Sequence, residues 1–152
     1  MSFSSDIQST FISAAVASAT AISTAAAVGN NAALTLTASP YVTDAARKIT
    51  ITCAGDDDAI SFNIVGLDQL GNAATENLAG TDGGVSTSVG YWTSITSITA
   101  VGDPAGNVSA GTSNSVAAPI FGGRLRLKGL YAVNTATAGT ITFRETSPTG
   151  SV

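Results

Sequence analysis

Turn-forming residues recur at short spacing along this chain, and no other feature of the sequence constrains its fold as strongly. Gly, Asn, Asp and Pro gather in clusters such as Gly71-Asn72 and Asp82-Gly83-Gly84. Gly and Asn tolerate positive φ, and Asn and Asp side chains bond the nearby backbone, so such clusters reverse the chain. The segments between them are β-branched and strand-sized, which predicts strands at residues 33–37, 48–53, 60–65, 73–78, 94–101, 124–133 and 139–144.

Short strands about ten residues apart, without convincing helical segments between them, are typical of an all-β protein. We expect an antiparallel β-sandwich of jelly-roll or immunoglobulin-like type with an extended N-terminal arm. Asp56, Asp57 and Asp58 predict a hairpin loop between the second and third strands, and residues 69–72 predict a further turn. Two-residue alternation places six apolar side chains on the core faces of the second and third strands: Ile49, Ile51, Cys53, Ile60, Phe62 and Ile64.

Residues 91–101 follow a different pattern, because Trp92, Ile95, Ile98 and Val101 recur every third residue. That spacing fits neither a plain strand nor a helix face, and dense β-branching argues against a helix. We therefore expect a loop that leads into a strand with a bulge or bend, which changes the face that points inward.

The first thirty residues are Ala-rich and fit the strand pattern least well. They lack the positive start of a secretory signal, since the first Lys or Arg is Arg47. No stretch approaches the ~20 strongly apolar residues that cross a bilayer, so no membrane partner is expected. Residues 1–30 are predicted to form an arm and an early strand, which a neighbouring subunit could order by strand addition or exchange. Residues 31–152 are predicted to form one β-sandwich domain.

The chain holds few residues that could carry out a reaction, with no His, one Cys and 11% charged residues. Acid–base and nucleophilic catalysis depend on those side chains, and zinc spacings, phosphate-binding glycine loops and nucleophile motifs are missing from the sequence. We expect no enzymatic activity, no catalytic residue and no cofactor. Cys53, within an apolar alternation, fits a small buried hydrophobe better than a reactive thiol.

Two groups of acids have a functional interpretation beside a structural one. Asp56, Asp57 and Asp58 could hold a cation such as Ca²⁺, but no further acid follows at calcium-loop spacing, so we favour a solvated turn and predict no metal site. Asp68 and Glu76 flank a turn and could meet as a glycosidase-like pair. That second interpretation is disfavoured, because no series of sugar-binding aromatics surrounds them.

The formal net charge of −4 and the few cations disfavour nucleic acid as a partner, because phosphate binding needs clustered Lys or Arg. A surface of Thr, Ser, Asn and Ala is easier to understand if neighbouring subunits cover it. Tyr91 and Trp92 are either interface anchors or core residues. The side chains of Arg124, Arg126 and Lys128 either dock an acidic partner or stay solvated on a strand. The interface candidates are Phe3, Phe11, Tyr91, Trp92, Arg124, Arg126 and Lys128.

Residues 48–112 contain an ITI-type strand, an acidic turn, a G-x-D-x-x-G-N-x-x-x-E hairpin, an aromatic followed by ITSI, and a closing AGNVSxGT. This succession resembles small structural proteins of tailed bacteriophages. Trp92 takes the aromatic place, and RLRLKGLYAVNTATAGTITFRE resembles a second strand pattern of virion β-proteins. The hairpin pattern is carried by Gly66, Asp68, Gly71, Asn72 and Glu76.

The resemblance implies a non-enzymatic β-sandwich component of the virion, present in many copies as a symmetric oligomer. We expect a capsid decoration or cement protein on the capsid exterior, a homotrimer that bridges subunits of the major capsid protein. Two alternatives stay open. One is a tail or portal-region module such as an adaptor, fibre-attachment or baseplate part, and the other is a glycan-binding β-sandwich module.

Overall fold

The computed structural model describes residues 14–118, which form seven strands and no helix. All pairings are antiparallel, in the order β1-β7-β2-β6-β3-β4, and β5 pairs with β2. The predicted all-β antiparallel fold is confirmed, whereas the β-sandwich of jelly-roll or immunoglobulin-like type and the extended N-terminal arm stay predictions. The strands are β1 (Ser18–Ala27), β2 (Tyr41–Cys53), β3 (Ser61–Asp68), β4 (Ala73–Ala79), β5 (Val85–Thr87), β6 (Trp92–Val101) and β7 (Asn107–Ala117).

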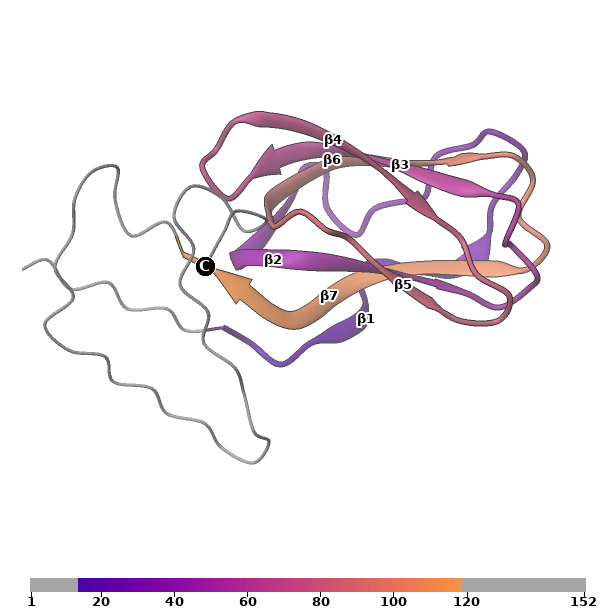
Figure 1. The fold of residues 1–152 in the computed structure, drawn as a ribbon, viewed down its shortest axis with the longest axis horizontal. Helices are drawn as coiled ribbons and strands as arrows, with labels where there is room; N and C mark the ends of the chain where they lie inside the picture. Colours follow the sequence, from indigo (N-terminus) through magenta and orange to yellow (C-terminus); the bar gives the residue numbers. More distant parts are fainter. Residues whose placement is uncertain (1–13, 119–152) are drawn as a thin grey trace, which may run out of the picture.

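Strand β2 pairs with strands of both layers, and the sheet folds along it. Its beginning pairs with β6, where Tyr41 lies opposite Ile95, whereas Ile51 further along the same edge pairs with β5. Strand β7 occupies the other edge of β2. Figure 1 shows β3, β4 and β6 on one side of the molecule and β1, β2, β5 and β7 on the other. The hydrophobic core fills the space between these two groups of strands.

The core confirms the predicted inward faces of β2 and β3. Five of the six expected side chains are buried there, and the sixth, Ile60, is half-buried just before β3 and packs against them. Alternation of apolar and polar residues thus places one face of each strand in the core and leaves the other face toward solvent. Strands β1, β4, β6 and β7 supply further core side chains, among them Ile22, Leu78, Trp92, Ile95, Ile98 and Val108.

The predicted bulge in residues 91–101 is also present. Val65 of β3 pairs with Ser97, but the next residue, Gly66, pairs with Ile95, so β6 holds one extra residue. As a result Ile95 and Ile98 are both fully buried in the core although they are three residues apart. A Cβ atom on Gly66 would lie 2.0 Å from the Ser94 carbonyl oxygen, so this close approach requires glycine.

The predicted hairpin loop at Asp56, Asp57 and Asp58 is wrong, because β2 and β3 are not neighbours. Both edges of β2 are occupied by β5, β6 and β7, so the chain crosses to the other layer, where β3 pairs with β4 and β6. The predicted turn at residues 69–72 is confirmed as the connection of the β3–β4 hairpin.

The other strand predictions have mixed outcomes. Residues 33–37 are not a strand, since Ala33 makes one isolated bridge with Thr99 and buried Leu34 covers the core. An early strand does occur within the first thirty residues, and this strand, β1, pairs with β7 of the same chain. The strands predicted at residues 124–133 and 139–144, and residues 1–13 of the predicted arm, lie outside the described residues.

Gly111 of β7 allows β1 to lie against it, which gives a test of this edge of the sheet. A Cβ atom at position 111 would lie 2.0 Å from the Ser18 carbonyl oxygen, so Gly111→Ala forces β1 away from β7. We expect a loss of about 1–3 kcal/mol in the free energy of unfolding, measured by urea denaturation. Gly29→Ala is the control, because its Cβ would meet only Ala32 Cβ at 3.8 Å. Equal stability of the two variants would contradict this packing of β1.

Candidate functional site

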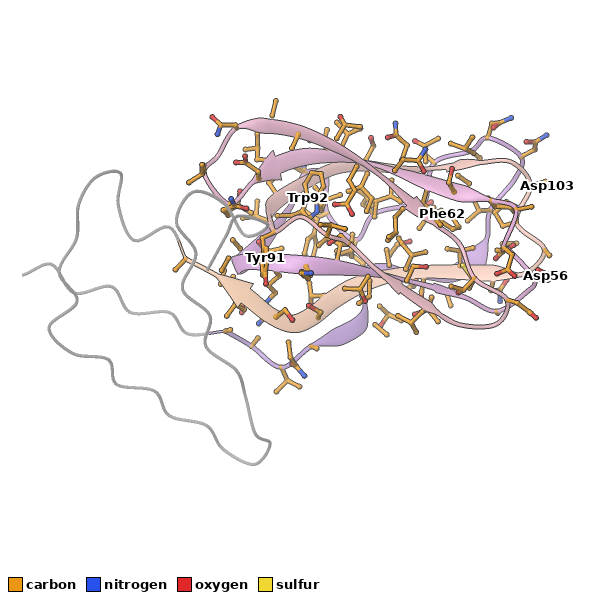
Figure 2. The ribbon with its side chains drawn as sticks, viewed as in Figure 1. Asp56, Phe62, Tyr91, Trp92 and Asp103 are labelled. Carbon is orange, nitrogen blue, oxygen red and sulfur yellow. The ribbon has the colours of Figure 1, made fainter. Side chains whose placement is uncertain are left out.

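The beginnings of β2 and β6 and the end of β7 meet at one end of the molecule, which we name the entry end. Arg47 of β2 pairs with Trp92 on one side and with Val116 on the other. The described chain starts and finishes here, because the Ala15 N–H bonds Asp44 and Ala117 pairs with Ala46. Figure 2 shows Tyr91 and Trp92 toward this end and Asp56 and Asp103 at the opposite one.

A buried arginine organises the entry end. The Arg47 side chain is 1% exposed, and its Nε atom lies 2.5 Å from Asp44 Oδ1. Its Nη1 group donates to the Ser113 carbonyl oxygen at 2.8 Å, and its Nη2 group donates to Asp44 Oδ2 at 2.9 Å and to the Ala15 carbonyl oxygen. Every nitrogen of the guanidinium therefore has an acceptor, which is what a buried charge requires.

Asp44 links this arginine to the chain that precedes β1. Its Oδ2 atom accepts the Ala15 N–H at 2.5 Å, and Asn114 Oδ1 accepts the Ala17 N–H at 3.0 Å. The hydrogen bond from Arg47 lowers the pKa of the Asp44 carboxyl well below its ordinary value of 3.8, although burial opposes this shift. Side chains rather than a regular ladder thus attach residues 15–17 to the body.

A hollow of about 330 Å³ lies beside this attachment. Its walls come from residues before and within β1 and from the beginning of β2. Val16 and Val42 in these walls are 87% and 68% exposed, so apolar surface stays open to solvent here. The lining residues include Ala15, Val16, Ala21, Tyr41 and Val42.

Two of the seven interface candidates fall within the described residues. Trp92 is 2% exposed and belongs to the core, which is one of the two roles that its sequence allowed. Tyr91 is half-buried, and the Lys48 ammonium lies 5.4 Å from the centre of its ring. The other candidates lie outside the described residues: Phe3, Phe11, Arg124, Arg126 and Lys128.

Asp68 and Glu76 line a second hollow, of about 290 Å³, but both carboxylates are bound by backbone N–H groups. Asp68 Oδ1 accepts from Leu70 at 2.8 Å and from Asn72 at 2.9 Å, and Glu76 accepts from Val89 and Gly90. Burial alone would raise the pKa of Asp68, but these hydrogen bonds outweigh it and lower that pKa. Both acids therefore hold loops in place.

The acids at the opposite end divide into a buried one and exposed ones. Asp57 is fully buried, and its Oδ1 atom accepts the Ala105 N–H at 2.7 Å, whereas Asp56 and Asp58 are exposed. The expected solvated turn is thus correct for two of the three residues only. Burial raises the pKa of the nearby Cys53 thiol, and the Asp57 carboxylate adds to that rise, so this thiol is the inert, buried group that the sequence predicts.

Residues 14–118 hold no group of three or more Cys, Asp or Glu side chains arranged to bind a metal ion. None of these residues forms a helix that is long and apolar enough to span a membrane. Comparison with protein-family models found no matching family, and comparisons with curated proteins and with solved structures found no match.

The sequence alone did not reveal the pairing of Asp44 with Arg47. Residues three apart on a regular strand point to opposite faces, so this spacing predicts no contact. A register shift of β2 against β6 between Val42 and Arg47 interrupts the regular strand over this segment and brings the two side chains together. The signal that the sequence offered for this site was an isolated charge: Asp44 is the first charged residue after Asp6.

The depressed pKa of Asp44 predicts an acid-sensitive contribution to stability. Because the folded pKa lies below the unfolded one, the contribution is complete above pH 3.8 and is lost as the pH falls below that value. At neutral pH, Asp44→Asn should lower the free energy of unfolding by about 1–2 kcal/mol, a modest value since the Asp44 side chain is 35% exposed. Urea denaturation at several pH values should show this difference shrinking in acid. A constant difference, or an equal loss in the exposed control Asp103→Asn, would contradict it.

The burial of Asp57 predicts that three consecutive aspartates contribute unequally. Asp57→Ala removes the acceptor of the Ala105 N–H and leaves a small void, so thermal or urea denaturation should show a loss of about 1–3 kcal/mol. Asp56→Ala, at an exposed position, should stay within about 0.5 kcal/mol of the unmodified protein. Similar small effects at both positions would support a fully solvated turn instead.

Proposed function

We propose that this chain is a non-enzymatic structural protein of a tailed-bacteriophage virion, a decoration or cement protein on the capsid exterior. In this role a homotrimer bridges subunits of the major capsid protein. The resemblance of residues 48–112 to small phage structural proteins motivates the proposal. The contacts of the folded chain supply its physical support.

The observation that carries the proposal is the open, uncharged edge formed by β1. Among residues 14–118, this strand pairs with β7 on one side, its other side receives hydrogen bonds from Thr37 alone, and seven of its ten residues are exposed. Residues 7–43 contain no charged side chain. Isolated proteins usually protect such an edge with Lys, Pro or a covering segment, because unpaired backbone groups attract other strands. A surface of this kind suits a protein that works while covered by neighbours.

The use of the charged groups supports a structural role over a catalytic one. Arg47, Asp44, Asp57, Asp68 and Glu76 each bind backbone groups of their own chain. Their carboxylates and guanidinium are thus occupied in holding loops and strand ends. Charged side chains committed in this way fix the shape of the molecule and leave its neutral surface for contacts.

In the proposed mechanism, strand edges and small side chains of the protein add backbone hydrogen bonds and buried area between capsid subunits. Each bound copy stabilises the assembled shell over its separate subunits by mass action, since it binds only the assembled arrangement. The described residues begin and end at the entry end, and most interface candidates belong to residues 1–13 and 119–152 of the sequence. We therefore assign the entry end to the contact with the capsid.

The oligomeric mass tests this proposal. Light scattering of the purified full chain should give a trimer of 15.0 kDa chains, about 45 kDa. Electron microscopy of phage particles labelled with an antibody to the protein should then show regular labelling over the head. A ring of six or twelve chains with label at the tail or portal would favour the tail-module alternative instead. A monomer that does not label virions would contradict both.

A further inference from the structure

Residues 14–37 form a unit that we name the N-terminal clip. It consists of the segment before β1, β1 itself and the chain that returns along its outer side. The Thr37 N–H donates to the Ile22 carbonyl oxygen at 2.8 Å, and the Thr37 hydroxyl donates to the Ala21 carbonyl oxygen at 2.7 Å. These hydrogen bonds are internal to the clip, so none of them has to break when the clip moves as a whole.

The clip closes the molecule by contacting both layers. Its first part pairs with β7, and its middle part bonds β6, where the Leu34 N–H donates to the Ile98 carbonyl oxygen at 2.8 Å. Ile22, fully buried, and Leu34, 6% exposed, enter the core from the clip. Without its clip, the body would expose core side chains that the clip covers. The body therefore needs a clip, but this clip need not belong to the same chain.

The seam between clip and body is incompletely packed at the entry end. The hollow of about 330 Å³ described above lies along this seam, between clip residues such as Val16 and Ala21 and body residues such as Tyr41. A hollow removes the close contacts that hold well-packed elements together. Beyond Ser18, the register of β1 against β7 shifts twice, at Ser23 and Ala26. The register of β3 against β6 within the body also shifts twice, so the attachment of the clip combines two register shifts with the hollow at the entry end.

Only residues 38–40 connect the clip to β2, and all three are exposed. Three extended residues span roughly 10 Å. With that length the chain can run straight from the clip into β2 in place of turning back. The clip would then leave its own body and reach a body placed beside the entry end. The contacts made there would be the same as those in the closed chain.

We propose that the N-terminal clip is exchanged between copies of this chain, so that the clip of one copy completes the fold of the next. The occupant of the clip site is thus a second copy, because the clip's strand register and core side chains already fit that site. The clip carries no charge, so copies of it do not repel one another. This proposal deepens the proposed function and rests on its homo-oligomer, in which neighbouring copies raise the local concentration of clips.

Disulfide trapping across the seam tests the exchange. Ala27 of the clip and Asn107 of the body are facing partners in the β1–β7 ladder, and both are exposed. In a Cys53→Ala background, full-length chains with Ala27→Cys and full-length chains with Asn107→Cys are unfolded together, refolded at high concentration and oxidised. Exchange should produce disulfide-linked dimers in the mixture and none with either variant alone. The ratio of linked to unlinked chains is read on a non-reducing gel.

A matched control uses Asn63→Cys and Asn77→Cys, which face each other across the β3–β4 hairpin inside the body. Mixed in the same way, these chains should not form linked dimers. A trimer without linked dimers in the first mixture, while the double variant Ala27→Cys/Asn107→Cys closes within one chain, overturns the exchange and leaves the proposed function standing. A monomer with only internal disulfides overturns the exchange and removes the homotrimer from the proposed function.

Discussion

One edge of β2 pairs with two different strands, and the rest of this structure depends on that constraint. A strand of regular register would pair with one strand along each edge and would extend a single flat sheet. Here β2 pairs first with β6 and then with β5, so the sheet must bend into two layers at the change of partner. Arg47 lies at that change and is buried. Its guanidinium donates to carbonyl groups of both β7 and the chain before β1, and so ties these two segments to β2.

Sequence periodicity predicted the parts of the fold that local residue patterns control. Alternation at Ile49 and Ile51 identified the inward faces, and the three-residue spacing after Trp92 identified the bulge in β6. Strand β7 was missed, because its Gly111 and many Ser and Asn residues lack the β-branched signature, although it lies between β1 and β2. The hairpin at residues 56–58 was wrong, since turn residues show where a chain bends and not which strand it joins next.

The candidate site was less predictable than the fold, for a related reason. Asp44 and Arg47 meet because β2 shifts register against β6 between Val42 and Arg47, and such a shift leaves no periodic trace in the sequence. Asp57 is buried beside two exposed aspartates because the connection after β2 crosses between layers, which fixes its side chain against Ala105. Both cases show charged residues placed where backbone groups lose their ladder partners. Three of the ten charged residues within residues 14–118 occupy such positions: Asp44, Arg47 and Asp57.

Within residues 14–118, the β1 and β4 edges of the sheet differ in how far other segments cover them. This difference bears on assembly. At the β4 edge, the Ser86 hydroxyl donates to the Ala79 carbonyl oxygen at 2.5 Å, and Glu76 binds the segment around Val89, so a loop covers this edge. At the β1 edge, Thr37 bonds the strand near Ile22 only, and the last four residues of β1 are exposed. One edge is therefore protected and the other left open. Because an open edge invites pairing, its position beside the hollow at the entry end favours assembly through β1 over assembly through β4.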